Sequence, residues 1–209
     1  MKPVLIEVQY LPPIAYFAAV QSASEIILER HEHYIKQSYR NRACINAAHG
    51  RENLIIPLTA KHGKVMITDV KIDHTQKWLN NHWRTVRSAY NNAPFYEYYA
   101  DDLEKVLFQR FTFLYELNVH LLSMCLRWLK WNVPIKESLS YEKTPAPSVI
   151  DSRSLINPKK TDLLQDFFTP TPYTQVFGST FEENLSLIDL VFCVGPSAAK
   201  IVTDSIPGK

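Results

Sequence analysis

Short apolar runs and a helix-compatible segment alternate at the start of the chain. Residues 4–8 are apolar except for Glu7, which is typical of a short buried strand. Pro12 and Pro13 interrupt this run and suit the entry of a helix over 14–22. Residues 25–29 form a second strand-like run. A β-α-β order of this kind favours parallel pairing of the two strands across the helix.

The next apolar runs have a different spacing. Residues 43–47 and 54–58 flank a polar stretch at 49–52, which predicts a β-hairpin. Residues 64–67 and 70–72 are short and apolar, and we expect them to extend this antiparallel part.

Helical periodicity begins near Thr75. Apolar and aromatic side chains recur every four residues from Trp78 to Tyr90, as on one face of a helix, and Pro94 ends this pattern. Two further helices are predicted over 95–108 and 112–131, and nothing between them would break a continuous helix.

The last third of the chain is less regular. Residues 134–172 are rich in proline and poor in apolar residues, which predicts a long irregular excursion. We expect a strand over 173–177 and a helix from 185 to about 195, where Ser186 and Asp189 would form a capping box. The prediction is one α/β domain spanning residues 1–209. Its mixed sheet would have a parallel start, an antiparallel extension and a helical layer, with an α+β fold as the alternative.

Composition and charge exclude several classes of protein. The chain has thirteen prolines but only five glycines, and it contains neither a GxGxxG nor a Walker-type loop, so a standard nucleotide-binding loop is not expected. A net charge of +2 is too small for a nucleic-acid-binding protein. We therefore expect a small-molecule ligand, no nucleic-acid partner and no cofactor.

The cysteines and the N-terminal sequence indicate the cellular compartment in which we expect the protein. Cys44, Cys125 and Cys193 are far apart and odd in number, which indicates buried thiols in a reducing environment. No leader-like segment opens the sequence, and no apolar run reaches the ~18 residues that a membrane-spanning helix needs. We expect a cytoplasmic protein without a transmembrane segment.

A basic segment at 36–42 is the first candidate binding site. Arginine and lysine side chains recognise anions, and Lys36, Tyr39, Asn41 and Arg42 suit a sugar-nucleotide pyrophosphate. The alternatives are a solvated charged loop or an edge strand that its charges protect from pairing.

Tyrosines near the strand ends are further candidates. Tyr10 and Tyr16 flank the turn after the first strand, where open parallel sheets bind ligands, although both could simply be packed. Tyr173 and Gln175 alternate on the predicted last strand and could reach the same pocket, although core packing is equally compatible with Tyr173.

Histidines supply the candidate acid–base chemistry. His82 lies on the apolar face of its predicted helix between two tryptophans, so it is either a general acid–base group or a core histidine with a satisfied hydrogen bond. His31 and His33, near Glu29 and Glu32, have no identifiable third ligand, and no metal site is predicted.

Five blocks of this sequence resemble, in order, the WbqC-like protein family. They are Tyr10-Leu-Pro-Pro-Ile-Ala-Tyr-Phe17, Lys36-Gln-Ser-Tyr-Arg-Asn-Arg42, Trp78-Leu-Asn-Asn-His-Trp83, Tyr90-Asn-Asn-Ala-Pro-Phe-Tyr96 and Leu185-Ser-Leu-Ile-Asp-Leu-Val-Phe192. The resemblance covers nearly the whole chain and is closest to the shorter branch of Bacteroidetes-type bacteria. It implies a role in the biosynthesis of O-antigen or another surface polysaccharide. Transfer of an amino acid, glycine, onto a sugar is one activity proposed for the family, and the resemblance implies no mechanism.

The chain departs from the family pattern in several places. Glu7 and Val8 stand where a Gln-Pro pair is common, Pro13 replaces a tryptophan, and His33 replaces a glutamine. Longer members have a further helix–strand unit near 143–172, so any ligand contact made by that unit is in doubt here.

Two functions remain open from the sequence. One is a transferase acting on a sugar, which would add an amino-acyl or acyl group to an amino sugar or nucleotide sugar. The other is a non-catalytic protein of the same pathway that binds a sugar nucleotide or acts as a scaffold.

Overall fold

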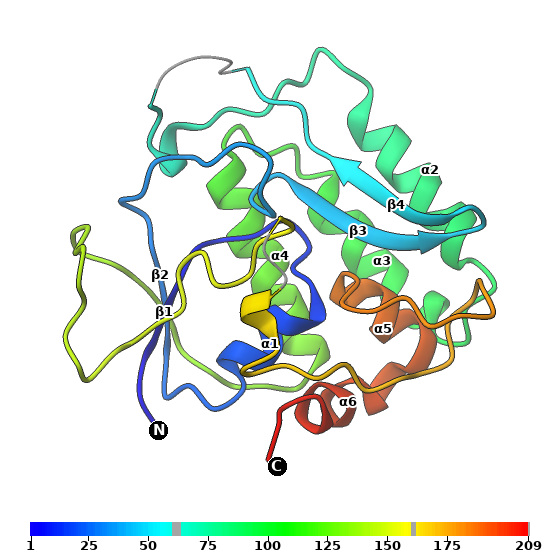
Figure 1. Ribbon diagram of the computed structural model, residues 1–209. Helices are drawn as coiled ribbons and strands as arrows, with labels where there is room; N and C mark the ends of the chain where they lie inside the picture. Colours follow the sequence, from blue (N-terminus) through cyan, green and yellow to red (C-terminus); the bar gives the residue numbers. More distant parts are fainter. Residues whose placement is uncertain (60–63, 160–161, 209) are drawn as a thin grey trace.

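The computed structural model describes residues 1–59, 64–159 and 162–208, and it contains two separate sheets (Figure 1). The larger sheet has the strand order β5-β2-β1-β6, and each neighbouring pair is parallel. Its strands are β1 (Val4–Ile6), β2 (Ile26–Leu28), β5 (Ile135–Glu137) and β6 (Ile150–Asp151). The smaller sheet is the antiparallel pair β3 (Arg42–Ala47) and β4 (Gly50–Ile55). The predicted α/β class is therefore confirmed.

The β-α-β opening forms as predicted. Val4 pairs with Ile26, and helix α1 (Ile14–Val20) connects the two strands, with Pro13 as its N-cap residue. Val4, Ile6 and the facing residues of β2 are at most 2% exposed. Alternate residues of these strands thus form the core, because successive side chains of a strand point to opposite faces.

Two strands of the parallel sheet come from the segment that was expected to be irregular. β5 pairs with β2, and β6 pairs with β1, so both flank the opening unit. These strands have three and two residues, which is too short for a recognisable alternation in the sequence. Within the excursion predicted at 134–172, residues 160–161 lie outside the described part of the chain.

The predicted hairpin is confirmed, whereas its expected extension forms no further strands among the described residues and is limited to isolated antiparallel bridges such as Leu58 with Ile72. Ala47 pairs with Gly50, so Ala48 and His49 form the turn, and Gly50 has the positive φ of +91° that glycine adopts without strain. In place of further strands, the following segment has a 3₁₀ turn at Ile67–Asp69 and isolated bridges such as His33 with Met66.

Six α-helices of the described chain surround the sheets (Figure 1). Their bounds beyond α1 are α2 (Trp78–Tyr90), α3 (Tyr96–Leu107), α4 (Leu114–Trp128), α5 (Leu187–Val194) and the short α6 (Ala198–Asp204). α3 and α4 are not continuous, since Arg110 between them has a φ of +55°. None of the described helices combines the length and apolar character that crossing a bilayer requires.

Two predictions near the C-terminus are wrong. Residues 173–177 belong to none of the strands in the described chain. Ser186 is the N-cap residue of α5, but its side chain makes no capping hydrogen bond and its buried Oγ has no partner. The carboxylate of Asp189 is instead bound by two tyrosine hydroxyls, from Tyr90 and Tyr173.

Candidate functional site

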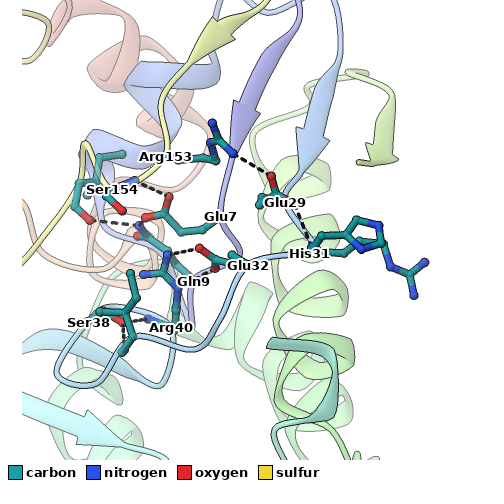
Figure 2. Close-up of polar contacts among 12 residues, drawn as sticks. Glu7, Gln9, Glu29, His31, Glu32, Ser38, Arg40, Arg153 and Ser154 are labelled. Atoms are coloured by element: carbon teal, nitrogen blue, oxygen red, sulfur yellow. Dashed lines mark hydrogen bonds and ion pairs between the residues drawn. The ribbon is translucent and has the colours of Figure 1, made fainter. Parts of the chain in front are cut away.

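The four parallel strands end at one edge of the sheet, and polar residues follow each of them. These residues are Glu7 after β1, Glu29 after β2, Ser138 after β5 and Arg153 shortly after β6. Ligands of open α/β sheets bind outside the carboxyl ends of the strands. Figure 2 shows Glu7, Glu29 and Arg153 together at this edge, which is therefore the candidate ligand-binding site.

Glu29 is the centre of one hydrogen-bond network. Its carboxylate is fully buried and accepts hydrogen bonds from the Ser138 hydroxyl at 2.7 Å, the backbone N–H of His31 at 2.9 Å and Nη1 of Arg153 at 3.0 Å. Arg153 also binds both carboxylate oxygens of Asp151. The ring of Tyr141 lies 4.9 Å from its guanidinium carbon. The network therefore joins the ends of β2, β5 and β6.

Glu32 and Arg40 form a second buried contact. Nε and Nη2 of Arg40 donate to the two carboxylate oxygens of Glu32 at 2.7 and 2.5 Å. Both side chains are almost completely buried, with Arg40 2% and Glu32 7% exposed. Burial raises the pKa of the Glu32 carboxyl, and the Arg40 guanidinium opposes this shift. The bidentate geometry fixes the loop after β2 against the start of the hairpin.

Glu7 and Gln9 lie beside this pair, after β1. Glu7 accepts hydrogen bonds from Nε2 of Gln9 at 2.9 Å and from the backbone N–H of Ser154 at 2.8 Å. Ser154 has a φ of +60°, which costs a non-glycine residue conformational energy. Such strained residues are common where a chain is shaped around a ligand.

A cleft of about 430 Å³ opens in front of these networks. Its lining residues are His31, Glu32, His33, Ile35, Tyr141, Arg153 and Ser154. This volume lies in the range of small-molecule sites, and the lining combines an aromatic ring, an apolar side chain and polar groups. The cleft can therefore hold a ligand of monosaccharide size.

His31 has the geometry of an oriented base in this cleft. Its Nε2 lies 3.1 Å from the carbonyl oxygen of Ser138. Because a carbonyl only accepts, Nε2 carries the proton and Nδ1 of the neutral ring is left as an acceptor. The backbone bond to Glu29 holds the residue from the other side. Among the described residues, no protein group is hydrogen-bonded to Nδ1.

The structure places His82 away from this cleft. The ring is 6% exposed, with Nδ1 at 3.0 Å from the Tyr10 hydroxyl and Nε2 at 3.2 Å from the carbonyl oxygen of Ile55. Burial lowers the pKa of His82 to about 4. Both nitrogens are thus used within the protein, and His82 does not line the cleft.

Tyr10 and Tyr16 support the site from behind. Both are fully buried, and the Tyr16 hydroxyl donates to the carbonyl oxygen of Glu7 at 3.2 Å. The backbone N–H of Tyr10 donates to the carbonyl oxygen of Tyr39 at 2.8 Å. These contacts hold the backbone after β1 rather than forming a wall of the cleft.

The basic segment divides between the surface and the interior. Lys36 is exposed next to the cleft residue Ile35, whereas Asn41 is buried, with its amide donating to the carbonyl oxygen of Ile56. Tyr39 and Arg42 are half-buried, and the buried Nε of Arg42 has no hydrogen-bond partner in the described chain. The predicted residues of this segment are therefore not gathered around the cleft, although the segment begins there.

Tyr173 and Gln175 belong to a different cluster. The Tyr173 hydroxyl lies 2.6 Å from Oδ1 of Asp189, and Nε2 of Gln175 lies 3.4 Å from the same oxygen. Burial raises the pKa of Asp189, and the tyrosine hydrogen bonds oppose this shift. The cluster fixes the 173–177 segment to α5 and shares no residue with the cleft.

A second cleft of about 470 Å³ lies between the hairpin turn and α2. Its lining residues are Ala47, Ala48, His49, Asn81, Arg84, Thr85, Ser88 and Ala89. It contains none of the buried networks that characterise the sheet edge, and its polar side chains are on the surface of one helix and one turn. The sheet-edge cleft is therefore the stronger candidate.

Neither a thiol nor a metal site accompanies the cleft in the described chain. All three cysteines are buried, and burial raises the pKa of Cys125 and of Cys193 to about 12. No group of three or more described His, Cys, Asp or Glu residues is arranged to hold a metal ion.

Sequence reasoning passed over most of these groups. Glu7 and Glu29 follow strands directly, and this position was a usable signal for both residues. Arg153 had no such signal, because β6 was not recognisable. His31 was noted only as an incomplete metal ligand.

Comparisons with known proteins place this geometry in a family. The description "WbqC-like protein family" applies to the match over residues 8–157, which begins after β1 and includes β2, β5 and β6 with the residues that follow them. The chain is 27% identical to the uncharacterized protein Rv1507c of Mycobacterium tuberculosis (strain ATCC 25618 / H37Rv), over 94% of this chain and 95% of that protein. No solved structure matches significantly. The chain belongs to the WbqC-like protein family.

Proposed function

We propose that the protein is a transferase of bacterial surface-polysaccharide biosynthesis that adds an acyl or amino-acyl group, such as glycyl, to the amino group of a sugar. The observation that carries this proposal is His31, a base with a fixed tautomer at the mouth of the sheet-edge cleft. The family's association with O-antigen synthesis supports the pathway.

The cleft suits a sugar acceptor. Tyr141 is 56% exposed and offers an aromatic face, and aromatic rings bind sugars by stacking. His33 and Ser154 at the rim can exchange hydrogen bonds with ring hydroxyls. The buried Glu32 and Arg153 fix the shape of the inner wall through their ion pairs.

The proposed reaction needs one base and an activated donor. Nδ1 of His31 takes a proton from the sugar amine while the nitrogen forms a C–N bond to the donor's carbonyl carbon. The donor is a thioester or a mixed anhydride by class. Its bond between the carbonyl carbon and the sulfur or oxygen of the carrier breaks, and the carrier leaves with the electron pair as a thiolate or a phosphate. Direct attack is favoured over a covalent enzyme intermediate, because the described thiols are buried.

A non-catalytic sugar-binding role has one specific observation in its favour. Arg153 and Arg40 already bind protein carboxylates, so neither is left as a free cation for a transition-state oxyanion. In this case the same cleft would bind the sugar without a reaction.

The two roles can be separated with His31→Ala and a matched His33→Ala control. His33 lines the same cleft, but no residue in the described part of the chain makes a hydrogen bond that orients its side chain. The full chain would be incubated with UDP-glucosamine and a glycyl thioester, and N-glycyl product would be measured by mass spectrometry. General acid–base catalysis contributes roughly 10²–10⁴-fold, so His31→Ala should lose about that factor and His33→Ala much less.

Two results would count against the transferase. Equal activity of both variants would remove His31 as the base. Saturable binding of the sugar by the wild-type protein, with no product from any activated donor, would favour the non-catalytic role.

A further inference from the structure

Ser138 connects the ends of two neighbouring strands of the parallel sheet. It is the first residue after β5, and its backbone N–H donates to the carbonyl oxygen of Leu28, the last residue of β2, at 2.9 Å. Its hydroxyl donates to Oε1 of Glu29 at 2.7 Å and accepts the backbone N–H of Arg30 at 3.2 Å. Ser138 therefore binds three consecutive residues at the end of β2.

The backbone carbonyl of the same serine binds the ring of His31. Its oxygen lies 3.1 Å from Nε2 of His31, and the backbone N–H of His31 donates to Oε1 of Glu29, which also accepts the Ser138 hydroxyl. The ring and the backbone of His31 are thus both bound to groups that Ser138 provides or contacts. Which nitrogen of a neutral imidazole carries the proton is set by such hydrogen bonds, so the position of this carbonyl decides that Nδ1 remains the acceptor.

Glu29 is held in place from its other side as well. Its Oε2 accepts Nη1 of Arg153 at 3.0 Å, and Figure 2 shows Glu29 between Arg153 and His31. Because the carboxylate is fully buried and charged, its hydrogen bond from the Ser138 hydroxyl is stronger than one between neutral groups. His31 and Arg153 line the cleft, and Glu29 and Ser138 lie behind them. The latter two can act on a ligand only through the side chains that they hold.

The hydroxyl of Ser138 is not needed for pairing of the strands. β5 pairs with β2 through backbone groups, and the backbone N–H of Ser138 continues this pattern. The hydroxyl adds contacts only to Glu29 and Arg30, next to His31. We infer that Ser138 is a positioning residue, whose hydroxyl bond to Glu29 holds its carbonyl so that His31 keeps its proton on Nε2 and leaves Nδ1 free to accept. This inference deepens the proposed function, since it rests on His31 as the base of that reaction.

The test measures how fast the ring N–H of His31 exchanges with water, by NMR on the full chain without substrate. His74 supplies an internal reference, because its Nε2 lies 2.8 Å from the carbonyl oxygen of Phe111, a contact that involves neither Ser138 nor Glu29. The His31 signal is identified by its absence from the spectrum of His31→Gln. In Ser138→Ala we expect the Nε2–H of His31 to exchange roughly tenfold faster and that of His74 to be unchanged.

Two further variants assign the effect to the hydroxyl. Ser138→Thr retains the hydroxyl, and a hollow of about 270 Å³ that Ser138 borders can accommodate the added methyl group, so exchange should stay at the wild-type rate. Ser140→Ala removes an exposed hydroxyl from the same segment and should also leave the rate unchanged. Unchanged exchange of His31 in Ser138→Ala, or equal acceleration at His31 and His74, would overturn the assignment. If Ser138→Ala fails to fold, the wild-type ring still decides, because a proton found on Nδ1 would overturn it.

Transfer activity is measured separately, so the two ideas can fail independently. If the proposed reaction is correct, Ser138→Ala should lower kcat with little change in KM, because the cleft surface is retained and only the orientation of the base is lost. Faster exchange in Ser138→Ala together with an inactive wild-type protein would support the positioning role and count against the transferase. Reduced transfer with unchanged exchange would overturn the positioning role.

Discussion

The hydroxyl of Tyr10 lies 3.0 Å from Nδ1 of His82, and both side chains are buried. Nε2 of the same ring lies 3.2 Å from the carbonyl oxygen of Ile55. One tautomer satisfies all of these atoms: Nε2 carries the proton and donates to Ile55, and the tyrosine hydroxyl donates to Nδ1. His82 thereby joins the turn after β1 to the end of β4.

This relationship predicts a pH dependence of stability. The pKa of His82 is about 4 in the folded protein and near 6.5 in an unfolded chain. Between these values the unfolded state binds more protons, so the stabilising contribution is complete above about pH 6.5 and is lost as the pH falls towards 4. The shift corresponds to about 3 kcal/mol. The free energy of unfolding can be measured by urea denaturation of the wild type and of His82→Gln between pH 4.5 and 7.5. It should rise less steeply with pH in the variant.

An exposed histidine provides the control for this experiment. His33→Gln should retain the wild-type dependence of the free energy of unfolding on pH, since His33 is exposed. If the free energy of unfolding depended on pH identically in the wild type and in His82→Gln, His82 would not be the group that causes this dependence.

The Arg40–Glu32 contact predicts a large stability loss. Arg40→Met leaves a buried carboxylate without its partner, which typically costs about 3–5 kcal/mol. The exposed Arg30–Glu137 pair is the matched control, and Arg30→Met should cost less than about 1 kcal/mol. Chemical denaturation measures both. Similar losses for the two variants would contradict the structural role of the buried pair.

The tyrosine contacts of Asp189 predict that the 173–177 segment is fixed by one hydroxyl. Tyr173→Phe removes a 2.6 Å hydrogen bond to a buried carboxylate, and such bonds to charged groups contribute about 1.5–3 kcal/mol. Tyr98→Phe, at a 77% exposed position, should be nearly neutral. Thermal unfolding and limited proteolysis near residue 175 would report the difference. An unchanged melting temperature in Tyr173→Phe would refute this role.

The cysteines predict a simple chemical result. Cys44, Cys125 and Cys193 are buried, and burial raises the pKa of each thiol. A disulfide reagent at pH 8 should therefore react slowly with the native protein and rapidly with all three thiols in denaturant. Rapid reaction of one thiol in the native protein would identify an accessible nucleophile, and Cys→Ser variants would show which one it is.

Local patterns in the sequence were sufficient for the elements that they encode. The apolar runs around Pro12 and Pro13 gave β1, α1 and β2, and the four-residue spacing from Trp78 to Tyr90 gave α2. The helices predicted over 95–108 and 112–131 correspond to α3 and α4, but the sequence left their continuity open, because no helix-breaking residue marks the positive φ at Arg110. β5 and β6 were missed because strands this short carry no periodicity and exist through their pairing with β2 and β1.

The burial and the partners of polar residues could not be predicted from local sequence patterns. The sequence alone determined that charged and aromatic groups cluster after the first two strands, since their order along the chain is enough to show it. Only the tertiary structure decided that Arg40 is buried against Glu32, that His82 is held by Tyr10, and that His31 borders a cleft. Arg153 reaches Glu29 across 124 positions of the chain. The physical reason is that hydrophobic periodicity is a local property, whereas the burial and pairing of a charge depend on groups that only the completed fold brings together.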